Sequence, residues 1–272
     1  MNSKKPKYQQ IYVEITNICN LSCPFCLPTK RTPKQMTIDE VKIVAEKIKP
    51  FTHSVYLHVK GEPLTHNNLE SIINIFKDNN IKVKITTNGI GILNHSNYLL
   101  NNDAISKINI SLQSIHDWDK DQIKVYFDDL NNYINRNEKT HIYLRNWALD
   151  IKDRNNLEDE LRTIFPTATF KDGELLNKLV HYSLAEKFEW PNMDANECEK
   201  STCLGGKNQI GILSDGTVIL CCLDTNGDTN LGNIFEEDLE SIILSEKYIK
   251  AVTNMPYLEL CKKCTYRLRF KK

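Results

Sequence analysis

The sequence lacks the features of a membrane protein, of an exported protein and of a nucleic-acid-binding protein. No apolar run approaches the roughly 18 residues that a membrane-spanning helix requires. The 35 basic and 35 acidic side chains cancel, so no chain-wide positive field favours nucleic acid or an anionic membrane surface. The first ten residues are polar and basic, which argues against a signal peptide. We therefore expect a cytoplasmic protein with no nucleic-acid or membrane partner.

Cysteine is absent between Cys26 and Cys198, although the chain contains nine cysteines. The odd number and the lack of export features weigh against a disulfide framework. Three cysteines lie near the start of the chain and six lie from Cys198 onward. This distribution predicts two metal sites, one toward each end of the chain.

Short runs of apolar and β-branched residues alternate with runs of helical periodicity. The expected strands are 11–15, 55–59, 81–85, 108–112, 141–144 and, more weakly, 168–170. The expected helices are 37–50, which Thr37 and Glu40 open with a capping box, 69–76, 123–134 and 156–165. This order predicts parallel βαβ units, too few for a complete eight-stranded barrel. We expect an α/β fold, with a partial (β/α)6 barrel over residues 1–184.

The pattern changes after about Val180. Two apolar runs, 210–213 and 218–222, flank Ser214-Asp215-Gly216-Thr217, which predicts a β-hairpin. A last helix is expected over 239–249. Residues 185–272 are therefore expected to form a small α+β domain.

Cys19, Cys23 and Cys26 have the spacing C-x3-C-x2-C and directly follow the first expected strand. Three thiolates from one loop can hold three irons of a [4Fe–4S] cluster, which leaves the fourth iron open for a substrate or cofactor. The alternative is a tetrahedral zinc site completed by a histidine. However, no histidine lies within the 25 residues that follow Cys26.

This loop resembles the cluster-binding loop of the radical S-adenosylmethionine (SAM) superfamily, and the resemblance covers residues 10 to about 180. Phe25 stands before the third cysteine, where the family usually has an aromatic residue. Gly61-Glu62-Pro63 is similar to the family's Gly-Gly-Glu-Pro motif, with Lys60 in place of the first glycine. The resemblance implies that Gly61 and Glu62 bind SAM and that Glu62 accepts a hydrogen bond from the SAM amino group.

Further SAM contacts are implied at the ends of the later strands. Asn88, in Thr87-Asn88-Gly89, resembles the family's segment near the methionine moiety and ribose. Ser111 and Gln113 end the fourth strand, where ribose contacts are expected. Arg145 ends the fifth strand, where several relatives carry an arginine for the SAM carboxylate. The carboxyl ends of parallel strands are where such folds build their sites.

The second group of cysteines is similar to the start of a SPASM domain, in its shortened form called a twitch domain. Cys203, Gly216 and Cys221 have the spacing C-x12-G-x4-C, and Cys261 and Cys264 follow as C-x2-C. The resemblance implies that these four cysteines bind one auxiliary [4Fe–4S] cluster, while a zinc ribbon is the alternative. Cys222 is then expected to be a buried small hydrophobic residue. Cys198 is a surface thiol, an alternate ligand or a thiol near the substrate.

The resemblance implies an enzyme that reductively cleaves SAM to a 5′-deoxyadenosyl radical, which abstracts hydrogen from a substrate. We expect a two-electron oxidation of a small molecule such as a sugar or aminocyclitol, with the auxiliary cluster as electron acceptor. The alternatives are a maturase that modifies a peptide or protein and, outside catalysis, a zinc- or cluster-bearing binding protein. A basic C-terminal tail is either a solvated chain end or a docking surface for an acidic electron donor such as flavodoxin or ferredoxin. Its residues are Lys262, Lys263, Arg267, Arg269, Lys271 and Lys272.

Overall fold

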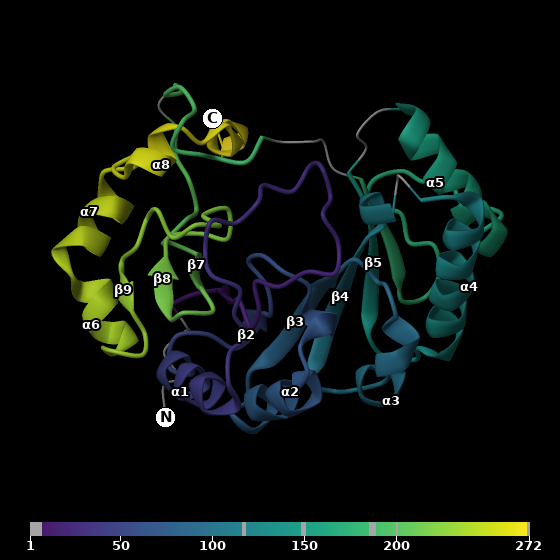
Figure 1. Ribbon diagram of the computed structural model, residues 1–272, viewed down its shortest axis with the longest axis horizontal. Coiled ribbons are helices and arrows are strands. Elements are labelled where there is room, and N and C mark those ends of the chain that lie inside the picture. Colours follow the sequence, from purple (N-terminus) through teal and green to yellow (C-terminus); the bar gives the residue numbers. More distant parts are fainter. Residues whose placement is uncertain (1–6, 116–117, 148–150, 185–188, 200, 271–272) are drawn as a thin grey trace. The chain divides into compact units, whose positions relative to one another are not determined.

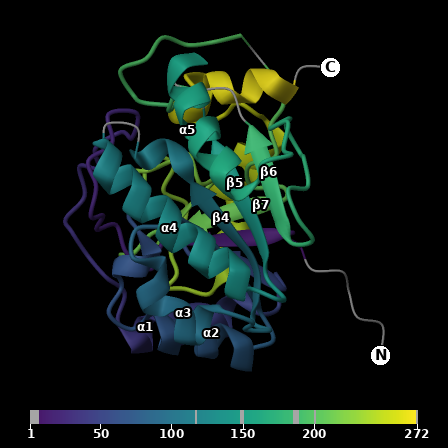
Figure 2. The ribbon, with the colours of Figure 1, turned by 90° about the vertical axis from the view of Figure 1, so that its right-hand side faces the viewer.

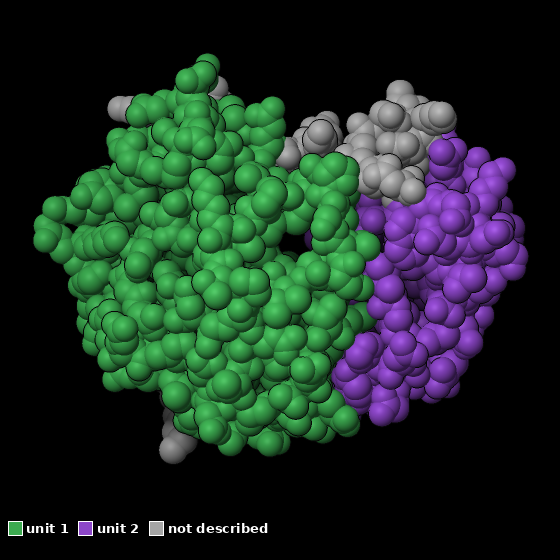
Figure 3. All heavy atoms as spheres, in the orientation of Figure 1, with its two compact units in different colours: residues 1–83, 188–272 green, residues 84–187 purple. Residues whose placement is uncertain are grey.

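The computed structural model describes residues 7–115, 118–147, 151–184, 189–199 and 201–270 (Figure 1). The chain divides into two compact units (Figure 3). Unit 1 comprises residues 1–83 and 188–272, and unit 2 comprises residues 84–187. Unit 1 thus combines the beginning of the expected barrel with the C-terminal segment. The expected domain boundary, between residues 184 and 185, falls at the edge of the described residues.

The sheet of unit 1 is ordered β2-β1-β7-β8-β9. These strands are β1 (Gln10–Val13), β2 (Ser54–Tyr56), β7 (Gln209–Ile212), β8 (Thr217–Ile219) and β9 (Gly232–Asn233). Strand β1 pairs in parallel with both β2 and β7, whereas β7, β8 and β9 pair antiparallel. The expected hairpin is therefore confirmed. The sequence did not predict that it extends the sheet from β1.

The helices of unit 1 are α1 (Ile38–Ile48), α2 (Leu69–Asp78), α6 (Leu239–Leu244), α7 (Glu246–Thr253) and α8 (Glu259–Lys262). Thr37 and Glu40 form the expected capping box of α1. The expected single helix over 239–249 is wrong, because two helices meet there. Ser245 is extended and its side chain accepts a hydrogen bond from the backbone of Tyr248, so it begins α7 instead of continuing α6.

The sheet of unit 2 is ordered β3-β4-β5-β6. Its strands are β3 (Lys82–Thr87), which begins at the end of unit 1, β4 (Ile105–Ser111), β5 (His141–Asn146) and β6 (Val180–Leu184). The pairs β4–β5 and β5–β6 are parallel. Helices α3 (Ser96–Leu99), α4 (Lys120–Arg136) and α5 (Ile151–Ile164) connect the strands, and α4 lies along one face of the sheet (Figures 1 and 2). Alternation of strand and helix confirms the α/β class.

The sixth strand lies at Val180–Leu184, so the expectation of a strand over 168–170 is wrong. Phe170 has φ 54°, outside the β region. The Glu174 carboxylate accepts hydrogen bonds from the backbone N–H groups of Thr169 and Lys171, which folds this segment into a loop. None of the helices within the described ranges is long and apolar enough to cross a membrane.

Candidate functional site

Cys19, Cys23 and Cys26 stand on the irregular loop between β1 and α1 of unit 1, and all three are free thiols. The backbone N–H of Cys26 donates to the carbonyl of Cys23 at 3.0 Å, which closes a tight turn. The backbone N–H of Leu21 donates to the Cys19 sulfur at 3.4 Å. Cysteine thiolates are the usual ligands of iron–sulfur clusters. The donor set of this loop therefore fits three ligands of such a cluster.

The Gly61-Glu62 segment is joined directly to the cysteine loop. The backbone N–H of Glu62 donates to the carbonyl of Ile18 at 2.9 Å. Gly61 has φ 74°, and a Cβ atom there would lie 2.4 Å from the carbonyl oxygen of Thr16. Only glycine permits this close approach. The structure thus places Gly61 and Glu62 beside the loop that carries Cys19, Cys23 and Cys26.

Glu62 is a buried carboxylate in the electrostatic neighbourhood of Cys19. It is 3% exposed, and its Oε1 accepts a hydrogen bond from the backbone of Leu64 at 3.0 Å. Desolvation raises the pKa of the Cys19 thiol; the Glu62 carboxylate adds to this rise, and the Lys60 ammonium opposes it. A carboxylate beside this loop can bind the cationic group of a ligand.

Lys60 points its ammonium group into the same loop. Its Nζ lies 2.7 Å from Sγ of Cys26, and it also donates to the carbonyl of Leu27. The ring of Trp190 lies beneath the ammonium at 5.7 Å, and Nε1 of Trp190 donates to the carbonyl of Phe25 at 3.1 Å. Phe25 therefore contributes a backbone contact to this neighbourhood. Sequence reasoning treated Lys60 only as a departure from the family motif.

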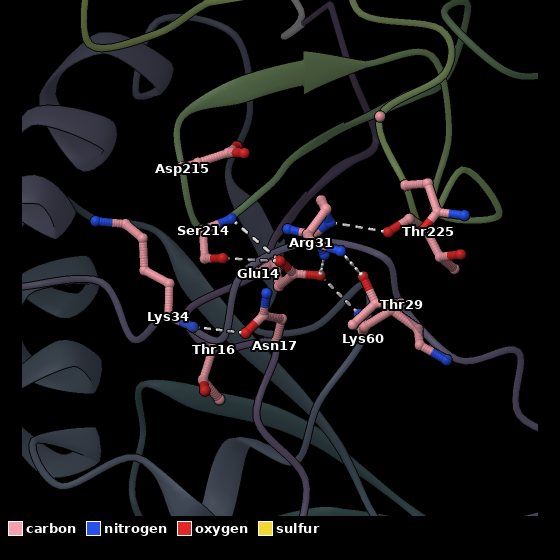
Figure 4. A network of polar contacts seen from close by, with 12 residues as sticks. Glu14, Thr16, Asn17, Thr29, Arg31, Lys34, Lys60, Ser214, Asp215 and Thr225 are labelled. Atoms are coloured by element: carbon pink, nitrogen blue, oxygen red, sulfur yellow. Dashed lines mark hydrogen bonds and ion pairs between the residues drawn. The ribbon is translucent and has the colours of Figure 1, made fainter.

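Glu14 is the centre of a buried network that the sequence analysis missed (Figure 4). It is fully buried and pairs with Arg31 at 2.7 Å. Its carboxylate also accepts hydrogen bonds from the backbone N–H of Lys60 at 3.0 Å and from the backbone and hydroxyl of Ser214 at 3.2 and 3.1 Å. Arg31 donates to the carbonyl of Thr225 at 3.0 Å. A single acidic residue inside the apolar run 11–15 was the signal available in the sequence.

This network joins segments that are distant in the sequence. Arg31 follows the cysteine loop, Lys60 precedes Gly61, and Ser214 belongs to the β7–β8 turn. Burial raises the pKa of Glu14, and the neighbouring Arg31 charge opposes that rise. The network fixes the cysteine loop against the C-terminal part of unit 1.

Cys203, Cys221, Cys261 and Cys264 share one electrostatic neighbourhood in unit 1. Burial raises the pKa of Cys261 to about 12, and nearby Cys203 and Cys264 add to the rise. Burial raises the pKa of Cys221 strongly, with smaller contributions from Cys222, Cys261 and Cys203. Four free thiols that influence one another in this way fit the ligand set of one iron–sulfur cluster. Over the part of the chain that the structure describes, no group of three or more His, Cys, Asp or Glu side chains is arranged to hold a single metal ion.

Cys198 and Cys222 also lie close to this second group of thiols. The Cys198 sulfur donates to the carbonyls of Lys262 and Cys264, each at 3.2 Å, and Arg267 reaches it at 3.4 Å. Cys222 is half-buried and lies beyond the end of β8. The expectation that Cys222 is fully buried is therefore wrong.

The C-terminal tail in the structure differs from the basic tail that the sequence predicted. Arg267 is 1% exposed, and its guanidinium donates to the carbonyls of Cys198 and Ser201. It therefore holds the C-terminal segment in place and is not part of a solvated basic surface. Lys271 and Lys272 lie outside the described residues.

Unit 2 holds the other predicted SAM contacts at the carboxyl ends of its strands. Ser111 and Arg145 are register partners at the ends of β4 and β5. The Arg145 guanidinium lies 4.8 Å from the centre of the Trp147 ring. Asn88 follows β3, and its side chain accepts a hydrogen bond from the backbone of Ile90. Gln113 is 4% exposed in the short helix Leu112–Ile115.

Two family models match this chain. Residues 13–146 match the Radical SAM superfamily, and residues 203–265 match SPASM, an iron–sulfur cluster-binding domain. The first match contains the loop with Cys19, and the second contains the four thiols from Cys203 to Cys264. The sequence-based resemblance is therefore confirmed.

A curated relative and two solved structures are similar to parts or most of the chain. The probable GTP 3′,8-cyclase of Methanocaldococcus jannaschii is 30% identical over 112 residues, which is 40% of this chain and 37% of that protein. The chain thus matches little more than a third of that relative's length. The structure of BtrN in complex with AdoMet and 2-DOIA is 18% identical, with 95% of this chain and 93% of that chain covered and a TM-score of 0.58. Streptococcus suis SuiB bound to precursor peptide SuiA is 15% identical, with 95% and 71% covered and a TM-score of 0.63. These structures confirm the partial-barrel fold with a small C-terminal cluster domain.

Proposed function

We propose that this chain cleaves SAM reductively and takes a hydrogen atom from a small-molecule substrate, because residues 13–146 match the Radical SAM superfamily and residues 203–265 match the SPASM domain. The reaction we propose is a two-electron oxidation, such as the dehydrogenation of an alcohol carbon of a sugar or aminocyclitol. One electron leaves with the abstracted hydrogen atom, and the auxiliary cluster would supply the acceptor for the other as the hydroxyl proton is released. The radical SAM domain implies SAM and a [4Fe–4S] cluster, and the SPASM domain implies an auxiliary iron–sulfur cluster. When bound, these groups supply the one-electron chemistry.

The observation that carries this proposal is the joining of the cysteine loop to Gly61-Glu62 in unit 1. Cys19, Cys23 and Cys26 would provide three ligands and leave one iron for SAM. Glu62 would accept a hydrogen bond from the SAM ammonium, since a charge-assisted bond to a buried carboxylate is stronger than a neutral one. The hydrogen bond from Glu62 to Ile18 holds this carboxylate in place relative to the loop.

The resemblance to the family supports four further SAM contacts, each at or near the end of a strand. Arg145 would bind the carboxylate of its methionine moiety, and Asn88, Ser111 and Gln113 would contact its polar groups. These contacts would orient SAM toward the substrate and exclude water from the reacting carbon. Cys203, Cys221, Cys261 and Cys264 would hold the auxiliary cluster.

An acidic electron donor of the flavodoxin or ferredoxin type completes the proposal. Lys262, Lys263 and Arg269 provide positive charge near the second group of thiols, although Arg267 does not. We place the protein in the cytoplasm, where such thiols remain reduced before metal binding.

Peptide modification is the second candidate function. The fold similarity to SuiB bound to its precursor peptide favours it. A dehydrogenase would convert a small alcohol to a carbonyl compound, whereas a maturase would change the mass or connectivity of a peptide. Product analysis distinguishes the two.

The test of the proposed function is SAM cleavage. The anaerobically reconstituted chain is reduced with dithionite in the presence of SAM, and 5′-deoxyadenosine is measured. The proposal predicts 5′-deoxyadenosine from the natural chain and none from the triple variant C19A/C23A/C26A. If a chain with intact clusters does not cleave SAM, the proposed activity is wrong and the remaining function is that of a metal-bearing binding protein.

A further inference from the structure

The strands of unit 2 have two chemically different faces. One face is apolar and fully buried, with Ile108, Ile110, Ile142 and Leu144 all at 0% exposure. The alternate side chains are polar and mostly half-buried. On β4, β5 and β6 these polar residues are Lys107, Asn109, Ser111, Tyr143, Arg145, His181 and Ser183.

Contacts between strands place these polar side chains on one continuous face. Tyr143 is the register partner of both Asn109 and His181. The Asn109 amide donates to the hydroxyl of Thr86 at 2.9 Å, which adds β3 to the same face. Lys84 lies two residues before Thr86 and therefore shares its direction. We call this surface, defined by Lys84, Lys107, Tyr143, Arg145 and His181, the basic face.

The strands that form the basic face contribute cationic side chains. Strands β3 to β6 contain no Asp or Glu. The Lys107 ammonium lies 3.4 Å from the centre of the Tyr143 ring, which in turn stacks on His181 at 4.4 Å. Among the described residues Lys107 has no carboxylate partner. The interaction of a cation with an aromatic ring is weaker than its interaction with an anion that is shielded from water.

The pKa values of two groups on the basic face are lowered, chiefly by burial and secondarily by neighbouring groups. The pKa of Lys107 is lowered from its usual value to about 8, chiefly by burial and to a smaller extent by the charges of Arg145 and Lys84. Desolvation lowers the pKa of His181, and nearby His141 and Lys107 contribute. A bound anion would stabilise the charged forms of both groups and so offset these effects.

We propose that the basic face binds an oxyanion of the substrate, a phosphate or a carboxylate, through Lys107 and Lys84. This inference rests on the proposed function, because it names the class of substrate on which the radical would act. Arg145 lies near the end of β5 and remains assigned to SAM. Lys107 lies on β4, four residues before Ser111, which is the register partner of Arg145. A substrate that bears an ammonium group, such as an aminocyclitol, would be repelled by this face, so the inference favours a phosphorylated or carboxylated sugar within the small-molecule class.

Ligand binding to the full reconstituted chain tests the inference without requiring catalysis. Isothermal titration calorimetry at pH 7 is performed with inorganic phosphate, succinate and ethanolamine. We expect phosphate or succinate to bind and ethanolamine not to bind; which anion binds more tightly identifies the oxyanion. K107M should weaken anion binding at least tenfold, and K107R should retain it.

Lys139 provides the matched control. It lies in unit 2 on the surface, where it pairs with Asp103 at 3.2 Å and is not part of the basic face. K139M removes the same charge and should leave anion binding unchanged. If K107M does not fold, as judged by circular dichroism, K84M is measured against K139M instead.

The outcomes separate this inference from the proposed function. Equal anion binding by the natural chain and K107M, or binding of ethanolamine in preference to both anions, overturns the basic face even if SAM is cleaved. Loss of anion binding in K107M with retention in K139M and K107R supports it even if 5′-deoxyadenosine is not formed.

Discussion

The ammonium nitrogen of Lys60 lies 2.7 Å from the sulfur of Cys26, at the position where the family motif has a glycine. Lys60 is 8% exposed, so little water screens its charge. Hydrogen bonds to cluster sulfurs and nearby charge are two determinants of cluster reduction potentials. This contact therefore gives the chain a cation directed at one of the three proposed ligands.

Replacing Lys60 should make the first cluster harder to reduce. K60M removes a positive charge that stabilises the more negative reduced state, so its midpoint potential should fall by several tens of millivolts; about 60 mV corresponds to about 1.4 kcal/mol for one electron. A redox titration followed by electron paramagnetic resonance measures this shift. K60R keeps the charge and should stay near the natural value, and an unchanged potential in K60M would refute the electrostatic role.

Breaking the Glu14–Arg31 pair should destabilise unit 1. R31M leaves a fully buried carboxylate without its partner, which should lower the free energy of unfolding by about 3 kcal/mol. Urea unfolding measures the change. K42M is the matched control, because it removes one side of the exposed pair with Asp39. A loss no greater than that of K42M would contradict the account of the network.

G61A should disrupt the connection between the Glu62 segment and the cysteine loop. The added Cβ would meet the carbonyl of Thr16 at 2.4 Å in a backbone with φ 74°. We expect a fall of more than about 2 kcal/mol in unfolding free energy, with loss of bound iron. Gly173 has φ 78° with nothing within 4 Å of its Cβ position, so G173A reports the backbone strain alone and should cost about 1 kcal/mol. Equal effects of the two variants would show that the close approach is unimportant.

Anion binding at the basic face should weaken above pH 8. The pKa of Lys107 is lowered to about 8, first by burial and then by Arg145 and Lys84, while Tyr143, His141 and His181 also lie nearby. A lysine with a lowered pKa loses its proton as the pH rises through that value, so affinity should fall about tenfold from pH 7 to pH 9. Calorimetric titrations across this range measure the profile. K107R remains charged and should flatten it; an identical decline in K107R would assign the pH dependence to another group.

The sequence predicted the local features of this fold well. The capping box at Thr37 and the turn at Gly216 depend on residues a few positions apart, and both form as expected. The cysteine spacings likewise predicted two groups of thiols, whose role as cluster ligands stays a prediction. Local chemistry determines such features, so one sequence is sufficient to predict them.

Long-range contacts were the part that the sequence did not predict. The parallel pairing of β1 with β7 and the burial of Glu14 against Ser214 join segments about 200 residues apart. The strand at 180–184 was missed because the polar residues His181 and Ser183 interrupt its apolar run. Arg267 was assigned to a solvated tail, although buried carbonyl groups satisfy its guanidinium.

The most direct test of the account is a count of iron and sulfide in three anaerobically reconstituted proteins. The natural chain should contain about eight irons, and both C19A/C23A/C26A and C203A/C221A/C261A/C264A should contain about four. SAM cleavage should be absent from the first variant, which lacks the open site. Zinc in place of iron in the natural chain, or an iron content that neither variant lowers, would contradict the assignment of two iron–sulfur clusters to these seven cysteines.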